Sequence, residues 1–213
     1  MSQLLSNIGQ LLIDISFPGD PTGIPAGQYF AVSTFTAHPY SRGHIHITSS
    51  DPSGPVDFQT GFFLDQVDVT KHVWAYKTQR EIVRRMATYR GVLAAGHPPF
   101  TSESDAACRK IDEPLKDVQN IKYTAEDDGI IRKWCIEHVG TTWHSLGTCK
   151  MAPLAEGGVV DPDLSVYGVT GLKVADMSIP PTNIAANTAN TAYAIGEKAS
   201  DIFIKELVAA RGS

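Results

Sequence analysis

A histidine and an asparagine, far apart in the chain, are the two residues best suited to chemistry. His144 lies in the segment Thr142–Met151, between Trp143 and a Gly-Thr-Cys turn. Asn187 opens an Asn-rich segment before the last predicted helix. An unperturbed imidazole titrates near pH ~6.5, so it can take a proton from an alcohol, and an amide can hold the oxygen. If the fold brings them together, the pair predicts chemistry on a hydroxyl group.

Both residues also have a structural interpretation. A lone histidine is more often structural, and only Trp143 and the tight Gly147-Thr148 turn favour a shaped apolar pocket around His144. Asn187 can equally cap the helix that follows, because Asn side chains accept hydrogen bonds from N–H groups at helix starts. Asn190, one helical turn further on, is the rival candidate for the same chemical role. From the residues alone, these alternatives stay open.

An ordered set of motifs between about Tyr29 and Lys205 resembles the glucose–methanol–choline (GMC) flavoprotein oxidoreductases. Within that family the motifs are most similar to those of the alcohol (methanol) oxidase branch. In chain order they are His38-Pro39-Tyr40-Ser41-Arg42-Gly43, Ile47-Thr48-Ser49, Asp51-Pro52, His144-Ser145-Leu146-Gly147-Thr148-Cys149, Gly158-Val159-Val160-Asp161, Val166–Ile179, Asn187-Thr188 and Ile195-Gly196-Glu197-Lys198-Ala199. Each motif is weak by itself, and their common order makes the resemblance specific.

The resemblance implies FAD as cofactor and assigns roles to five residues. His144 matches the family histidine that assists removal of the substrate hydroxyl proton, and Asn187 matches the residue that hydrogen-bonds the substrate oxygen. Asp176, Met177, Asn187 and Thr188 are expected to contact the cofactor. The implied reaction passes a hydride from the alcohol carbon to the flavin, after which O2 reoxidises the flavin and yields hydrogen peroxide.

The dinucleotide-binding half of such an enzyme has no counterpart in these residues, since no Gly-x-Gly-x-x-Gly motif follows a predicted strand. We therefore expect the C-terminal portion of a flavin-dependent alcohol oxidase, with a small primary alcohol and O2 as partners. Activity would require an N-terminal FAD-binding portion. The alternative is a catalytically inactive fragment, or a binding module of the same fold.

Composition excludes several other classes of protein. The 213 residues are 42% hydrophobic and 19% charged, an ordinary globular composition. A net charge of −5 argues against a nucleic-acid partner, because phosphate binding needs a basic surface. No apolar run approaches the ~20 residues that cross a membrane. The location stays unknown: these residues contain no secretory signal, and three unpatterned cysteines are more consistent with the reduced thiols of an intracellular protein. A homo-oligomer stays open.

The periodicity predicts an α+β fold, with a mainly antiparallel sheet and flanking helices, to position His144 and Asn187. Expected strands lie at 29–36, 43–48, 57–64 and 171–176, and expected helices at 65–90, 126–139 and from Thr188 or Asn190 to about Val208. The first helix should pack on one face of the sheet and turn its Lys and Arg residues mostly toward solvent. His44 and His46 share one strand face, but no third ligand stands near them, so we expect no metal site.

Three parts are expected along the chain. Residues 1–27 are rich in Pro and Gly and indicate an N-terminal surface excursion. Residues 28–163 correspond to a substrate-binding domain that carries the His144 segment. Residues 164–213 correspond to a strand and helix that return to the FAD-binding domain. The last helix should bury a stripe of Ala192, Ile195, Ala199, Ile202 and Phe203.

Overall fold

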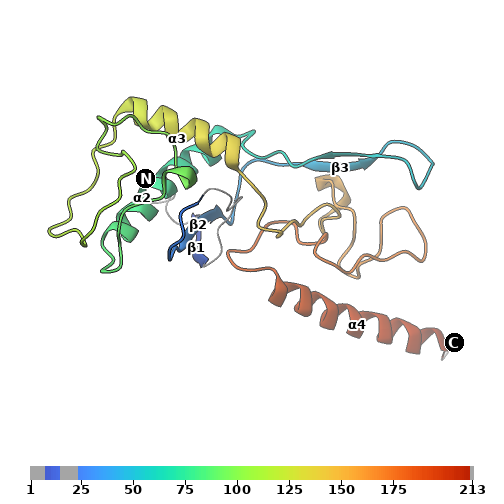
Figure 1. Ribbon diagram of the computed structural model, residues 1–213. Coiled ribbons are helices and arrows are strands. Elements are labelled where there is room, and N and C mark those ends of the chain that lie inside the picture. The colour runs from blue at the N-terminus through green and yellow to red at the C-terminus, as the bar shows by residue number, and fades with distance from the viewer. Residues whose placement is uncertain (1–7, 15–23, 212–213) are drawn as a thin grey trace. The chain divides into compact units, whose positions relative to one another are not determined.

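The computed structural model describes residues 8–14 and 24–211, and the chain forms two compact units (Figure 1). The first unit comprises Met1–Arg42 and Gly61–Gly140, and the second comprises Gly43–Thr60 and Thr141–Ser213. The fold is mixed α+β, as predicted, and both sheets of the described residues are two-stranded and antiparallel. No helix among the described residues is long and apolar enough to cross a membrane.

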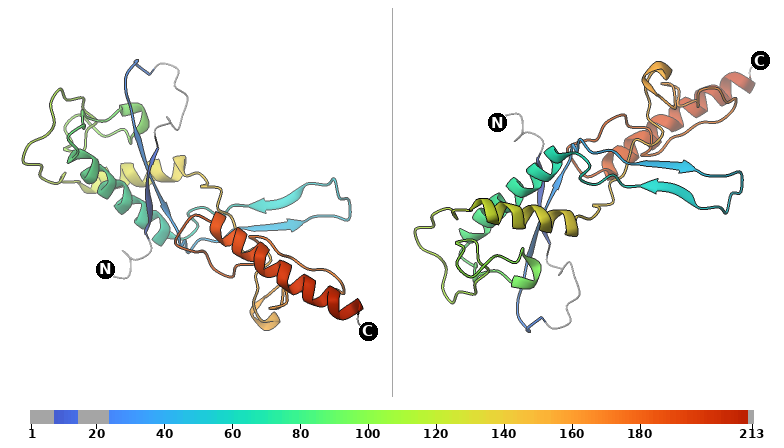
Figure 2. Two further views of the ribbon diagram at one scale, coloured as in Figure 1. Left: turned by 90° about the horizontal axis from the view of Figure 1, so that it is seen from below. Right: turned by 90° about the horizontal axis from the view of Figure 1, so that it is seen from above.

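The first unit is built on strands β1 (Ile8–Asp14) and β2 (Ala31–Thr36), which pair antiparallel. Helix α2 (Gln66–Arg84) packs against both strands, as expected for the helix at 65–90, although it ends earlier. Helix α3 (Ala125–His138) lies beside α2, and both views of Figure 2 show this pair. A short 3-10 turn, η1, spans Ala94–Gly96.

Strand β1 falls within residues 1–27, the predicted N-terminal surface excursion. Residues 1–7 and 15–23, which include most of the Pro and Gly residues on which that prediction rests, lie outside the described residues, and Ile8–Asp14 is a strand. The reason is pairing: its backbone matches Ala31–Thr36 along most of its length, which satisfies the hydrogen-bonding groups that a loop would leave to water.

The start and end of α3 follow the sequence prediction. Thr124 caps the helix, and its side chain and that of Asp127 form a reciprocal capping box. Ile131 is buried on the packed face. At the C-terminal end the His138 ring stacks on Trp134 at a centroid distance of 3.7 Å, and Nδ1 lies 2.9 Å from the Trp134 carbonyl oxygen. His138 therefore packs against the last turn of this helix.

Two basic residues of α2 are buried, which corrects the prediction of a solvated basic face. Lys71 donates to the carbonyl oxygen of His38 at 3.0 Å and pairs with Asp68 at 3.5 Å. Arg80 donates to the carbonyl oxygen of Ala106 at 2.8 Å. Long basic side chains can enter a core where backbone oxygens or a carboxylate receive their N–H groups. Here the two carbonyl partners come from distant segments, whereas Asp68 lies three residues before Lys71 on the same helix.

The second unit contains the hairpin of β3 (His44–Ile47) and β4 (Val56–Gln59). Strand β3 was predicted at 43–48. Strand β4 is shorter than the predicted 57–64, because the chain turns at Gly61, which has a positive φ of 68°. The unit also holds the 3-10 turn η2 (Leu154–Glu156) and helix α4 (Ala189–Arg211).

Helix α4 covers a small apolar core made of Val160, Leu164, Ile179 and Ala199. Ile195, Ile202 and Phe203 pack against this core, which confirms most of the predicted stripe. Ala192 is exposed instead. Met151 and Val159 pack on the same core, so the segment after Thr141 groups with α4 rather than with the residues before it.

Residues 171–176, expected as a strand, run beside residues 164–166. The N–H of Val166 donates to Leu172 at 3.0 Å, and that of Val174 donates to Leu164 at 3.1 Å. A single isolated bridge joins Ser165 to Lys173. This contact is too short to form a ladder, and it holds Asp176 and the residues after it against the core.

Candidate active site

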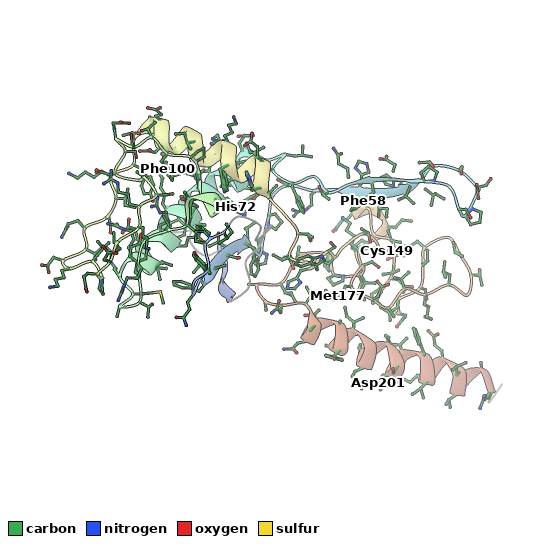
Figure 3. The ribbon with its side chains drawn as sticks, viewed as in Figure 1. Phe58, His72, Phe100, Cys149, Met177 and Asp201 are labelled. Carbon is green, nitrogen blue, oxygen red and sulfur yellow. The ribbon has the colours of Figure 1, made fainter. Side chains whose placement is uncertain are left out.

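The segment that carries His144 is fixed to the core by a second segment. Residues 147–151 lie beside residues 177–179 through three backbone hydrogen bonds. These run from Gly147 to Met177 (3.2 Å), from Cys149 to Ser178 (2.9 Å) and from Met151 to Ile179 (2.7 Å). Cys149 and Met177, labelled in Figure 3, come one from each segment. Because Ile179 is buried, the pairing ties the end of the His144 segment to the packed interior of the unit.

Left-handed backbone conformations stand on both sides of His144. Gly147 has φ +84°, and a Cβ at this position would lie 3.2 Å from the carbonyl oxygen of Pro180, so glycine suits the turn. Trp143 has φ +57°, which is rare for a residue with a large side chain, and its N–H donates to Thr141 Oγ1 at 2.9 Å. The two turns set the direction in which the His144 side chain leaves the backbone.

The structure brings His144 and Asn187 together within the second unit. Nε2 of His144 is hydrogen-bonded to Oδ1 of Asn187. His144 is half-buried and Asn187 is exposed, so the pair lies at the surface of this unit. An amide oxygen can only accept a hydrogen bond, and Nε2 is therefore the donor in this contact.

The start of α4 distinguishes Asn187 from its rival. The helix begins at Ala189, and the Thr188 carbonyl accepts a hydrogen bond of 2.9 Å from the Ala192 N–H. Asn187 therefore lies just before the helix, whereas Asn190 lies inside its first turn. The hydrogen bond from His144 is made to Asn187. Of the two candidates, Asn187 is therefore the one whose side chain contacts His144.

A hollow of about 430 Å³ opens between the His144 segment, the 175–178 turn and the first turn of α4. Its lining residues are Ser145, Leu146, Thr148, Ala175, Asp176, Met177, Ser178 and Ala192. Asp176 and Met177, both predicted as cofactor-binding residues, are in this set, whereas Asn187 and Thr188 are not. The volume lies in the range of small-molecule sites.

Asp176 presents a negative charge at this hollow. Its Oδ1 accepts a hydrogen bond of 2.8 Å from the Ser178 N–H. Hydrogen bonds from the side chain and backbone of Ser178 lower the pKa of Asp176 below its usual value of 3.8. The carboxylate is therefore ionised at neutral pH and suits a ligand that carries hydroxyl groups.

Three hydroxyl side chains of the lining, Ser145, Thr148 and Ser178, were not predicted as site residues, although Thr148 belongs to the turn that indicated a pocket. All three lie inside the motifs that carry the family resemblance, within four residues of His144 or Asp176. Serine and threonine are common throughout the chain, so only the position within a motif could have indicated them. Among the residues that the structure describes, no three His, Cys, Asp or Glu side chains cluster as a metal site would require.

With this geometry established, the comparisons with known proteins define the class. Residues 39–196 match the family model described as GMC oxidoreductase, and the chain belongs to this family. The match contains the hairpin, the His144 segment, Asn187 and the first part of α4.

Named relatives and solved structures are consistent with this family assignment. An alcohol oxidase from Pichia angusta is 38% identical over 236 aligned residues, which cover 90% of this chain and 36% of the relative. An FAD-dependent oxidoreductase from Chaetomium thermophilum superposes with a TM-score of 0.65 at 26% identity, covering 84% of this chain and 27% of that one. A formate oxidase from Aspergillus oryzae shares the fold, with a TM-score of 0.66 at 21% identity over 89% of this chain and 29% of its own. The chain thus spans 36% of the alcohol oxidase it resembles.

Proposed function

We propose that the chain is the C-terminal portion of an FAD-dependent alcohol oxidase, which converts a primary alcohol and O2 into an aldehyde and hydrogen peroxide. One observation carries the proposal: a histidine and an asparagine that can handle a hydroxyl group meet, and Ser145, the residue after His144, lines a hollow of small-molecule size. The similarity to an alcohol oxidase supports the choice of substrate class. The substrate loses two electrons and two protons, and O2 gains both.

The residues around the hollow fit a part of FAD. The Asp176 carboxylate can accept hydrogen bonds from the hydroxyl groups of the cofactor's ribityl chain, and Met177 supplies an apolar contact. Thr188 precedes the N-terminus of α4, where the aligned peptide dipoles favour negative charge on a ligand. Bound FAD would accept the hydride from the alcohol carbon.

His144 is proposed to take the proton of the substrate hydroxyl at Nε2. This requires a neutral imidazole whose hydrogen is on Nδ1, because a nitrogen that already carries hydrogen cannot accept a proton. In the observed contact Nε2 donates to Asn187. In the tautomer with the ring hydrogen on Nδ1, the substrate oxygen would replace the Asn187 oxygen as the partner of Nε2.

Asn187 is proposed to hold the same substrate oxygen through the NH₂ of its amide. The amide must turn so that Nδ2, rather than Oδ1, faces the alcohol. A hydrogen bond from Nδ2 stabilises the negative charge that grows on the oxygen as the proton leaves. The two side chains already meet at one point, so only the amide and the ring hydrogen need to reorient.

The proposal also assigns the parts of the chain. Residues 28–163 would form the substrate-binding domain, with the His144 segment, and residues 164–213 would supply a strand and helix to the FAD-binding domain. The remainder of the FAD-binding domain would come from an N-terminal portion equivalent to the part of the relatives that this chain does not span.

The test is reconstitution with an FAD-binding partner. The chain is co-expressed with the portion of the Pichia angusta alcohol oxidase that lies outside the matched region, and the purified complex is supplied with FAD and a series of primary alcohols. We expect a yellow complex that forms aldehyde and hydrogen peroxide in equal amounts. A complex that holds FAD but oxidises no alcohol would identify an inactive fragment or a binding module instead.

A further inference from the structure

One face of the β3–β4 hairpin is entirely apolar and exposed. The strand register pairs Ile45 with Phe58 and Ile47 with Val56, so the four side chains lie on the same face. Their exposed fractions are 46% for Ile45, 87% for Ile47, 51% for Val56 and 64% for Phe58. We call these four residues the apolar hairpin face.

The opposite face of the hairpin is polar. His44 lies 3.2 Å from a carboxylate oxygen of Asp57, and the rings of His44 and His46 stack at 5.1 Å. Gln59 completes this side, opposite His44 in the register. The side suited to water is thus already defined, and a sheet with one polar and one apolar face packs its apolar face on another layer.

A two-stranded hairpin with such a face is incomplete by itself. Isolated two-stranded hairpins are only marginally stable in water, and they gain stability from a further strand or from a covering layer. Contiguous exposed apolar side chains of this kind mark interaction surfaces. The apolar hairpin face therefore needs a partner surface.

Helix α4 of the same unit presents a second exposed apolar surface. Its inner side packs on the core, yet Tyr193, Ile204, Leu207 and Val208 are all exposed, at 59% or more. A helix that is apolar on both sides is usually covered on both sides. Two uncovered apolar surfaces on one small unit favour a large covering partner over a single contact between two copies, which buries one patch on each copy.

We infer that the apolar hairpin face docks the FAD-binding polypeptide that corresponds to the part of the relatives this chain does not span. The hairpin lies within residues 39–196, the region that the family model matches, and the chain covers 36% of the alcohol oxidase relative. A unit shared with longer proteins retains the surfaces on which their remaining part packs. The inference rests on the proposed function for the nature of this partner.

The experiment compares two substitutions on one strand. Ile47→Lys places a charge on the apolar hairpin face. His46→Lys places the same charge at the neighbouring position, on the polar face of the hairpin. Both side chains are exposed, so neither change should alter the thermal unfolding of the free chain. Binding to the FAD-loaded portion of the Pichia angusta alcohol oxidase outside the matched region is measured by titration calorimetry, with no alcohol present.

We expect Ile47→Lys to weaken this binding at least about tenfold, because burying one aliphatic side chain contributes at least the free energy of a tenfold change in Kd. We expect His46→Lys to change the Kd by less than about twofold. Equal binding by wild type and Ile47→Lys would overturn the inference, and so would the absence of binding by the wild type. A free chain that is dimeric, and that Ile47→Lys makes monomeric, would assign the face to a second copy and also overturn it.

The outcome is separable from that of the proposed function. A complex that depends on Ile47 but oxidises no alcohol contradicts the function and leaves the docking face intact. A complex that oxidises alcohols and assembles equally well with Ile47→Lys contradicts the docking face and leaves the function intact.

Discussion

At the scale of single residues, His144 illustrates what a motif can and cannot predict. The ordered series of motifs was enough to predict both site residues: His144 from its motif between Trp143 and the Gly-Thr-Cys turn, and Asn187 from its own motif. The contact between Nε2 and Oδ1 joins residues 43 positions apart. Such a contact depends on how residues 147–151 and 177–179 pair, and no local pattern in the sequence specifies that pairing.

His97 shows the opposite case, a residue whose environment gave no sequence signal. It precedes a proline in a loop, yet its Nδ1 lies 2.9 Å from the Tyr76 hydroxyl oxygen. Burial, together with the nearby charge of Arg80, lowers the pKa of His97 from 6.5 to about 4. The folded state therefore keeps this ring neutral through a range of pH in which the unfolded chain protonates it.

This shift predicts that the first unit loses stability on acidification from pH 6.5 to 4. The unfolded state binds the extra proton there, so the free energy of unfolding should fall by about 1.4 kcal/mol per pH unit for this one residue. The loss should be complete near pH 4, the folded-state pKa. The measurement is urea unfolding followed by tryptophan fluorescence in a Trp143→Phe background, where Trp74 and Trp134 report on the first unit alone.

Replacement of His97 by Gln removes the titrating group and should flatten this pH dependence. Some slope should remain, because burial also lowers the pKa of His72 in the same unit. An unchanged slope in His97→Gln would show that the ring is already protonated at pH 6.

At the scale of elements, the positions of the helices were predictable and their charged contacts were not. Apolar spacing located α2 and α3 to within a few residues at most of their ends. The same spacing assigned Lys71 and Arg80 to solvent. A hydrophobic pattern cannot tell whether a distant backbone oxygen, such as that of His38 or Ala106, will receive a long basic side chain, because that partner is supplied by the tertiary fold.

Asp68 connects α2 to the turn that follows β2, and its removal should be costly. Its two carboxylate oxygens accept hydrogen bonds from the N–H groups of Tyr40 (3.0 Å) and Ser41 (2.7 Å), and it pairs with Lys71. Asp68→Ala removes the carboxylate that pairs with the buried ammonium of Lys71 and accepts the two backbone N–H groups. We expect it to lower the free energy of unfolding by about 3–5 kcal/mol.

Lys71→Met is the informative comparison. The carboxylate of Asp68 keeps its two N–H donors and stays in the first turn of α2, where negative charge is favoured. We therefore expect a smaller loss than for Asp68→Ala, measured by the same fluorescence-monitored urea unfolding. A loss in Lys71→Met that equals or exceeds the loss in Asp68→Ala would contradict the role given to the carboxylate.

At the scale of the whole molecule, the α+β class and the family were predictable, and the grouping of segments was not. The hairpin residues Gly43–Thr60 fall in the same unit as Thr141–Ser213, although the chain between them builds the other unit. The expected division into parts at 28–163 and 164–213 concerns function and stays a prediction. The compact units follow packing rather than sequence order, because Met151 and Val159 pack on the core of Val160 and Ile179.

The most direct test of the central claim is the rate of flavin reduction by an alcohol in the reconstituted complex, without O2, for His144→Ala. General acid–base assistance contributes about 10²–10⁴-fold, so the variant should be slower by that factor while it retains bound FAD. Asn187→Ala should cost less, about 1–3 kcal/mol, because it removes a hydrogen bond and leaves the proton acceptor. Asn190→Ala, the matched control, should react at the wild-type rate. Flavin reduction at the wild-type rate in His144→Ala, or a loss in Asn190→Ala as large as that in Asn187→Ala, would contradict the account.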